Sequence, residues 1–237
     1  MIVTKQTQQI NSSEFQEGLV LLINKEKSKS SFDAVRDIRK IMNIKKVGHA
    51  GTLDPLATGL LILCTGKKTK EIYKYQNMNK VYEGTITLGC ETPSMDSETE
   101  PTKILPVDGI SEKKINEVKE SFIGEIEQIP PMYSAIKHKG KSLYKYARKG
   151  IDIKREPRRI NIYDFKIKNI DLPNIDFKIE CSKGTYIRVV ASDFGKLLGC
   201  GGYLSRLERT KIGHYELENA IITEDLKKIQ INDLKLV

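Results

Sequence analysis

An aspartate and a histidine, Asp54 and His49, lie five positions apart in a stretch otherwise made mainly of small and apolar residues. The stretch runs from Val47 to Leu63 and reads V-G-H-A-G-T-L-D-P-L-A-T-G-L-L-I-L. A carboxylate in such a loop can act as a nucleophile or as a general base. Pro55 disfavours the helical region for Asp54, so we expect an extended carboxylate. Asp-Pro is also a common turn initiator, and the local pattern taken alone favours a structural turn.

The residues around this loop predict the elements that hold it. The apolar run from Leu60 to Leu63, ended by Gly66, predicts a buried strand directly after the loop, and the run from Gly18 to Ile23 predicts another. Between the two strands, Ser30 and Asp33 form a start like a capping box. The helix that begins there has apolar residues at helical spacing, namely Phe32, Val35, Ile38 and Met42.

Further helices and strands follow in mixed order, so the expected fold class is α/β, of the α+β type. We expect helices over 69–77, from Ser111 to Gly124, over 143–149, through Leu198 to Gly199, and from Thr223. Strands are expected over 80–89, 125–129, 160–165, 175–181 and 203–210. The polar, acidic segment from Glu91 to Pro101 is expected to be a mobile loop.

Length and composition exclude several classes of protein. The 237 residues suffice for one large domain or two small ones, and no run of about 18 apolar residues suggests a membrane span. The N-terminus lacks the apolar region of a signal peptide, so we expect a cytoplasmic protein. The four cysteines form no C-x-x-C pair, which argues against a zinc site or a disulfide framework. We therefore expect reduced, mostly buried thiols.

The charge balance favours a polyanionic partner such as RNA. Forty Lys and Arg residues against 31 Asp and Glu residues give a net charge of +9, and three basic clusters lie near tyrosines. One of them places Lys137, Lys139 and Lys141 in a turn before a helix capped by Ser142, where they could contact phosphates. Lys70, in another cluster, is a further candidate for contact with an RNA backbone.

The fourteen residues G-H-A-G-T-L-D-P-L-A-T-G-L-L closely resemble the catalytic motif of the TruB family, the tRNA pseudouridine-55 synthases, in which the aspartate is essential. Other segments resemble the same family in matching order over about residues 18 to 215. They are K-V-Y-E-G, I-P-P-M-Y-S-A-I-K-H-K-G-K-S-L-Y, G-T-Y-I-R and L-S-R-L-E-R-T. The segment E-T-P-S-M-D-S-E-T-E-P departs from the more regular family pattern at Pro93 and Ser94.

The resemblance assigns roles to single residues. It implies that Asp54 is the catalytic residue and that Arg188 pairs with it. It also implies that Tyr82 stacks on the target base, that Tyr186 lines the uridine pocket and that Leu207 packs at the pocket floor. His49 would fill the space that the base leaves or touch a phosphate. A lone histidine otherwise packs within its loop.

The implied fold is the pseudouridine synthase fold, a mixed, mostly antiparallel sheet flanked by helices. The implied reaction is isomerisation of uridine 55 in the TΨC loop of tRNA, without cofactor, metal or guide RNA. We expect a single catalytic domain over 1–237 that acts as a monomer. Residues 216–237 would form a short C-terminal extension, too short for a complete PUA domain.

Two other functions remain open from the residues alone. A related enzyme of the dyskerin branch would use a guide RNA to select its site. A non-catalytic protein that binds or folds tRNA would use the same basic surface, and it would not need Asp54.

Overall fold

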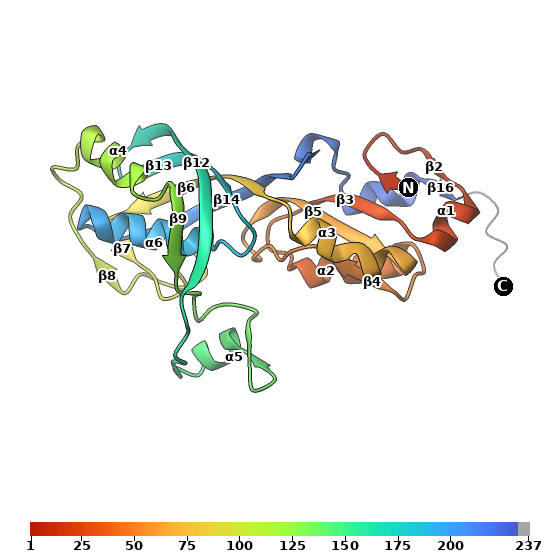
Figure 1. Cartoon of the computed structure of the whole chain (residues 1–237), viewed down its shortest axis with the longest axis horizontal. Coiled ribbons are helices and arrows are strands. Elements are labelled where there is room, and N and C mark those ends of the chain that lie inside the picture. The colour runs from red at the N-terminus through yellow and green to blue at the C-terminus, as the bar shows by residue number, and fades with distance from the viewer. Residues whose placement is uncertain (232–237) are drawn as a thin grey trace. The chain divides into compact units, whose positions relative to one another are not determined.

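The computed structural model describes residues 1–231, and the chain forms two compact units. The first unit contains Met1–Tyr82 together with the chain from Leu207 onward, and the second contains Glu83–Arg206. The chain passes from one unit to the other within β6 (Lys80–Leu88) and β14 (Gly202–Ile212) (Figure 1). The single domain over 1–237 stays a prediction, and the end of its expected extension, residues 232–237, lies outside the described residues.

Two strands that are apolar on both faces form the centre of the first unit. They are β3 (Val20–Lys25) and β5 (Thr58–Thr65), which pair antiparallel with Leu22 opposite Ile62. β1 (Ile2–Val3) adds in parallel to β3, and β4 (Val47–His49) pairs antiparallel with β5. Each face of these strands contributes to a buried apolar cluster. Both predicted strands are confirmed, and their burial makes them a rigid base for the loop between β4 and β5.

The helix α2 (Ser31–Ile41) begins as its sequence predicts. Ser30 caps it: the hydroxyl oxygen accepts from the Asp33 amide at 3.1 Å, and the Asp33 carboxylate accepts from the Ser30 amide at 2.8 Å. Val35 is buried as expected, but Phe32 is 56% exposed. The expected position of Phe32 in the apolar stripe is therefore wrong, because Ser31 takes the buried position in the first turn.

Shorter elements complete the first unit. They are β2 (Gln9–Ile10), α1 (Ser12–Glu17), the 3-10 helix η1 (Gly66–Glu71), α3 (Ile72–Gln76), β15 (Tyr215–Glu216), the 3-10 helices η2 (Leu217–Asn219) and η3 (Thr223–Lys228), and β16 (Gln230–Ile231). The helix expected over 69–77 is thus divided between a 3-10 turn and a short α-helix. The helix expected from Thr223 is a 3-10 helix.

The second unit is a mostly antiparallel sheet with helices packed on it. Its strands follow the order β14, β6, β13 (Asn174–Cys181), β12 (Arg158–Asp171) and β9 (Gly124–Gln128). The helices are α4 (Glu112–Glu120) and α6 (Ile187–Leu198), with Ser111 and Gly199 at the predicted cap positions. Phe122, Phe165 and Phe194 pack with ring centroids 5.8 to 6.2 Å apart and join both helices to the sheet. The predicted fold class and its mostly antiparallel sheet are confirmed.

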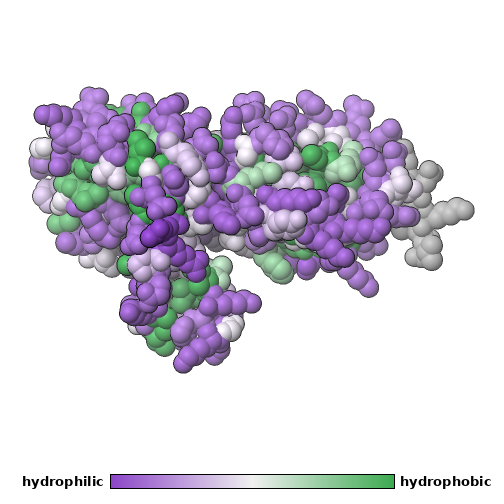
Figure 2. Space-filling model, in the orientation of Figure 1, coloured by the Kyte–Doolittle hydropathy of each residue, from purple (hydrophilic) through white to green (hydrophobic). Residues whose placement is uncertain are grey.

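Between β9 and β12 the second unit extends into a small lobe. It holds β10 (Lys137–His138), β11 (Lys141–Ser142) and α5 (Leu143–Ala147), and Figure 1 shows it in green beyond the ends of β9 and β12. Figure 2 shows hydrophilic residues around a small apolar area on this lobe. A last strand pair, β7 (Cys90–Glu91) with β8 (Lys103–Ile104), borders the polar segment that was expected to be mobile.

The cysteines and the helices of the described residues bear on the expected class of protein. All four cysteines are free thiols, and Cys64, Cys181 and Cys200 are buried, as predicted. Within residues 1–231, no helix has both the length and the apolar character needed to cross a bilayer.

Gly59→Ala should lower the free energy of unfolding by about 3 kcal/mol, because two costs combine. Gly59 has a φ of 103°, and a Cβ at this position would lie 2.4 Å from the Arg209 carbonyl oxygen. Gly199→Ala is the matched control: it has a φ of 85° but nothing within 4 Å, so the loss should be about 1 kcal/mol. Urea unfolding of both variants measures the difference. Equal losses would contradict a close packing of β5 on β14.

Candidate active site

The loop that carries Asp54 lies between the two strands of a hairpin. In β4, His49 pairs with Leu63 of β5, and the amide of Ala50 still donates to the Ile62 carbonyl at 2.9 Å. The chain then leaves the sheet, and a turn closed by the Ala57 amide donating to the Asp54 carbonyl at 3.1 Å brings it back. Asp54 lies outside any helix and is half-buried. Its flanking residues therefore decide how firmly the carboxylate is placed.

Leu53, directly before Asp54, is held by α2. The Ser31 hydroxyl accepts from the Leu53 amide at 2.8 Å and donates to the Leu53 carbonyl at 3.1 Å, and both residues are buried. One hydroxyl thus satisfies both backbone polar groups of Leu53. The start of α2 and the Asp54 loop must therefore move together.

Pro55, directly after Asp54, is held by the last residue of β3 and by the segment that follows this strand. Its carbonyl accepts from the Ser28 amide at 2.8 Å and from the Lys25 ammonium at 3.4 Å. Lys25 is only 1% exposed, and its Nζ also donates to the carbonyls of Glu26 at 2.9 Å and Lys29 at 2.6 Å. With both neighbours fixed, Asp54 has little freedom to change position.

Lys25 also interacts electrostatically with the catalytic candidate. Burial lowers the pKa of the Lys25 ammonium to about 8, the Asp54 carboxylate opposes that shift, and the Arg209 guanidinium adds to it. An attraction that favours the charged amine must equally favour the charged carboxylate. Lys25 therefore supports the ionised form of Asp54.

Arg209, in β14, binds the loop from its other side. This side chain is 1% exposed, and its Nε donates to the Leu60 carbonyl at 2.8 Å. The Nη atoms donate to the carbonyls of Gly51 at 3.3 Å and Thr52 at 3.4 Å. The guanidinium carbon also lies 6.0 Å from the ring centroid of Tyr82. Arg209 thereby joins the loop before and after Asp54 to the candidate stacking tyrosine.

The other candidates of the first unit differ in burial. Tyr82 is buried on β6, and Leu207 is half-buried at the unit's boundary in β14. His49 is half-buried; burial and the Arg209 charge lower the pKa of its imidazole, so it is neutral at pH 7. Lys70 is exposed on η1. The roles of these residues in binding RNA stay predictions.

In the second unit, Arg188 is 3% exposed in the first turn of α6. Its Nη1 donates to the Ser94 carbonyl at 3.0 Å, and its Nη2 donates to the Tyr133 carbonyl at 2.8 Å. Its Nε lies 3.5 Å from the Asp96 carboxylate. These contacts orient the guanidinium. The pairing of Arg188 with Asp54 stays a prediction.

The segment from Glu91 to Pro101 is organised around Asp96, unlike the mobile loop that was expected. Thr92 and Ser94 donate from their hydroxyls to the Asp96 carbonyl at 2.8 and 3.2 Å, and the Asp96 carboxylate accepts from the Glu98 amide at 2.9 Å. Thr92, Ser94 and Asp96 are all buried. The departure from the family pattern at Pro93 and Ser94 thus leaves an ordered loop that holds Arg188.

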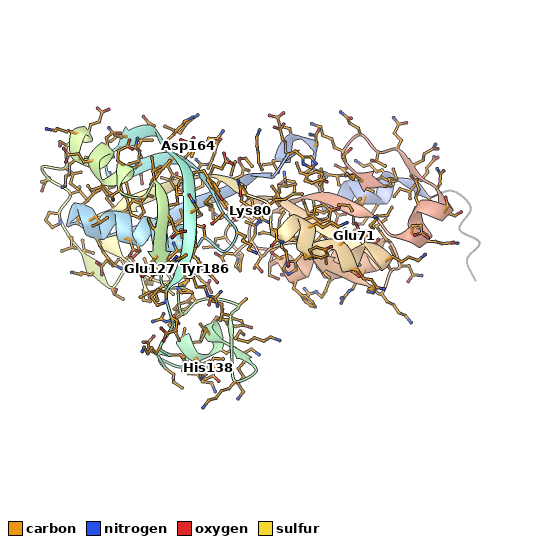
Figure 3. All side chains as sticks on the ribbon, in the orientation of Figure 1. Glu71, Lys80, Glu127, His138, Asp164 and Tyr186 are labelled. Carbon is orange, nitrogen blue, oxygen red and sulfur yellow. The ribbon has the colours of Figure 1, made fainter. Side chains whose placement is uncertain are left out.

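Tyr186 is the N-cap residue of α6, two positions before Arg188, and Figure 3 labels it. The side-chain amide of Gln128 binds both its backbone groups: it accepts from the Tyr186 amide at 2.8 Å and donates to the Tyr186 carbonyl at 3.1 Å. In the lobe, Lys137, Lys139 and Lys141 are exposed around the hairpin of β10 and β11, where Figure 3 labels His138.

The described structure thus divides the candidate residues between the two units. Arg209 contacts the Asp54 loop and the Tyr82 ring, and its charge acts on His49. Tyr186 and Arg188 lie together at the start of α6. Sequence reasoning missed the supporting roles of Lys25, Ser31, Asp96, Gln128 and Arg209. Arg209 and Ser31 had a signal, because they belong to the segments L-S-R-L-E-R-T and S-S-F-D-A-V, which resemble the family, and Asp96 lies in the segment that departs from the family pattern.

Solved structures with a similar fold include a complex and an RNP. A structure described as a Cbf5-Nop10-Gar1 complex matches with a TM-score of 0.70 and 26% identity, over 94% of this chain and 61% of that chain. An H/ACA RNP bound to a substrate RNA containing 2'-deoxyuridine matches with a TM-score of 0.66 and 26% identity, over 90% and 53% of the two chains. This chain therefore spans less than two thirds of either protein.

Sequence relatives are closer and match over more of their length. The tRNA pseudouridine synthase B of Flavobacterium johnsoniae is 50% identical over 215 residues, which cover 88% of this chain and 94% of the relative. That of Chloroherpeton thalassium is 47% identical over 215 residues, 89% of each chain. The family model described as TruB family pseudouridylate synthase (N terminal domain) matches residues 39–187, the part that holds Asp54, Tyr82 and Tyr186. The chain therefore belongs to the TruB family of pseudouridylate synthases.

Proposed function

We propose that this protein isomerises uridine 55 in the TΨC loop of tRNA to pseudouridine, as a monomer with a single catalytic domain and without guide RNA. Relatives of 47 to 50% identity carry the name tRNA pseudouridine synthase B. The observation that carries the proposal is the fixation of Asp54. Leu53 and Pro55 on its two sides are hydrogen-bonded to α2 and Lys25, while Asp54 itself is only half-buried.

The chemistry requires one carboxylate. The bond between N1 of the base and C1′ of the ribose breaks, the base turns, a bond from C5 to C1′ forms, and C5 loses its proton. Asp54 can attack C1′ to form a covalent intermediate, or it can remove a proton from the sugar to begin an elimination. Both routes need the ionised carboxylate, which the buried charge of Lys25 favours.

The target base must leave the loop stack to reach Asp54. Unstacking costs on the order of a few kcal/mol, and stacking on the ring of Tyr82 returns about 1 to 3 kcal/mol. Since the two terms are comparable, other contacts must contribute. Tyr186 would line the pocket, Leu207 would close its floor, and neutral His49 would fill the space left by the base or touch a phosphate.

Arg188 completes the proposed site by pairing with Asp54. Its side chain is already ordered by the Ser94 and Tyr133 carbonyls and by Asp96, so the charge would be presented without further loss of rotamer freedom. An arginine that is oriented before the substrate arrives stabilises developing charge without reorganisation.

The RNA backbone would contact four lysines that have no acidic partner. Among the described residues, Lys70, Lys137, Lys139 and Lys141 form no ion pair, whereas Lys67, Lys68 and Lys74 are paired with Glu17 or Glu71. The unpaired ammonium groups are available to phosphates. Such contacts weaken steeply as salt is added.

Asp54→Asn should leave folding and RNA binding intact and lower turnover by about three orders of magnitude or more, because the amide can neither attack nor accept a proton. Tritium release from C5-labelled uridine in a TΨC stem-loop, without cofactor or guide RNA, measures the reaction. Stem-loop binding and thermal unfolding are the controls. Turnover above a tenth of the wild-type value would exclude Asp54 from the mechanism.

Tyr82→Phe separates the ring of the tyrosine from its hydroxyl. If the hydroxyl helps to remove the C5 proton, turnover should fall at least about tenfold while binding of the stem-loop stays unchanged. Tyr73→Phe, an exposed tyrosine of the same unit, is the matched control. Unchanged turnover in Tyr82→Phe would assign the residue to stacking alone.

Asp96→Asn should lower turnover about tenfold or more, because it removes the carboxylate charge that lies 3.5 Å from the Arg188 Nε, while an acceptor for the Glu98 amide remains. The free energy of unfolding should also fall by about 1 to 3 kcal/mol. Asp108→Asn removes an exposed carboxylate from the same unit and should change neither quantity. An Asp96→Asn variant with wild-type turnover would refute the supporting role of this residue.

A further inference from the structure

Gln128, the last residue of β9, is 5% exposed and makes two hydrogen bonds to one residue. Its Oε1 accepts from the Tyr186 amide at 2.8 Å, and its Nε2 donates to the Tyr186 carbonyl at 3.1 Å, across 58 positions of sequence. A primary amide offers a donor and an acceptor side by side in one plane. Gln128 therefore binds the backbone of Tyr186 as a neighbouring strand would.

The bound residue is the point where α6 begins. Tyr186 has φ −97° and ψ 104°, and no side chain caps the helix there. The carbonyl of Tyr186 accepts the first amides of the helix, from Val189 at 3.1 Å and Val190 at 3.2 Å, and it accepts from Gln128 as well. Gln128 thus fixes where the chain enters the helix and how the peptide planes on both sides of the Tyr186 Cα are turned. Those planes determine the direction of the Tyr186 side chain.

The same stretch of chain also holds Arg188. Tyr133 lies five positions after Gln128, and its carbonyl accepts from Arg188 at 2.8 Å. One short segment therefore binds both residues that the second unit contributes to the proposed site. A shift at Gln128 would be transmitted to Tyr186 directly.

We infer that Gln128 is a positioning residue for pseudouridine formation, which acts by holding the backbone of Tyr186 so that its ring meets the reacting uridine. The inference rests on the proposed function, since it requires Tyr186 to line the uridine pocket. Gln128 does not touch the reacting atoms in this assignment. Its removal should lower turnover through Tyr186 and through no other route.

A double-mutant cycle tests that route. Gln128→Leu should reduce the single-turnover rate of tritium release about tenfold to a hundredfold, with KM for the stem-loop changed less than about threefold. In a Tyr186→Leu background, the same substitution should change the rate less than about twofold, because its target is already gone. The shift in Tm caused by Gln128→Leu should be the same in both backgrounds. Equal rate losses in both backgrounds would overturn the inference.

Gln128→Glu gives a second test through its protonation state. A protonated carboxyl donates and accepts as the amide does, whereas the ionised carboxylate turns a second acceptor toward the Tyr186 carbonyl. The charged residues next to position 128 are Arg158 on β12, which pairs with it across the sheet, and Glu127, its neighbour in the chain. The Arg158 charge favours the ionised carboxylate, whereas Glu127 and burial favour the neutral acid.

The rate of Gln128→Glu divided by the wild-type rate should therefore rise at least about fivefold between pH 8 and pH 5.5, because the acid form returns at low pH. The same ratio for Gln128→Leu should stay constant, which makes it the control. A wild-type protein without tritium release would refute the proposed function itself, and an active wild type with unaffected variants would refute only the role of Gln128.

Discussion

The burial of one guanidinium group, that of Arg209, determines the geometry of the Asp54 loop. Moving a charge out of water is costly unless its donors are satisfied. The carbonyls of Gly51, Thr52 and Leu60 satisfy them, so a displacement of the loop would take acceptors away from the buried guanidinium. The parallel pairing of Arg209 with Gly59 fixes the backbone of the arginine against the same loop. The Asp54 carboxylate, the proposed catalytic group, is thus placed by backbone contacts that no substrate needs to form.

A second buried cation, Lys25, has the same kind of partners. Its ammonium donates to backbone carbonyls, one of them in the Asp54 loop. Carbonyl groups carry no net charge, so they do not neutralise the cation that they bind. The charge of Lys25 can therefore act on the Asp54 carboxylate. The second unit uses the opposite solution: Arg188 lies against the carboxylate of Asp96. The arginine of the first unit, Arg209, is therefore held by carbonyl groups, whereas that of the second unit, Arg188, is held partly by a carboxylate.

Local sequence patterns predicted the elements whose conformation depends mainly on neighbouring residues. β3, β5, α2, α4 and α6 follow from apolar runs, helical spacing and caps, and the Asp54 loop follows from a motif of fourteen residues. The predicted burial of Phe32 was wrong because helical spacing does not distinguish the centre of an apolar stripe from its border. The buried Asp96 could not be recognised among the acidic residues around it. Its burial depends on Arg188, 92 positions later by residue number.

The supporting contacts of the site share this dependence on distant residues. Arg209 binds Leu60 across 149 positions, Arg188 binds Ser94 across 94, and Gln128 binds Tyr186 across 58. No local rule relates a polar side chain to a carbonyl so far away. The family resemblance supplied the residues proposed to touch substrate, while the residues that orient them required the structure.

The long separation between Arg209 and its loop has a consequence for synthesis. A ribosome releases the Asp54 loop early, but the arginine that fixes it emerges only after more than two hundred residues have been made. Contacts between such distant segments form late, because the chain between them must first be ordered. During most of its translation the nascent chain therefore carries the catalytic motif without its final geometry. Activity on RNA begins only when β14 has joined β5.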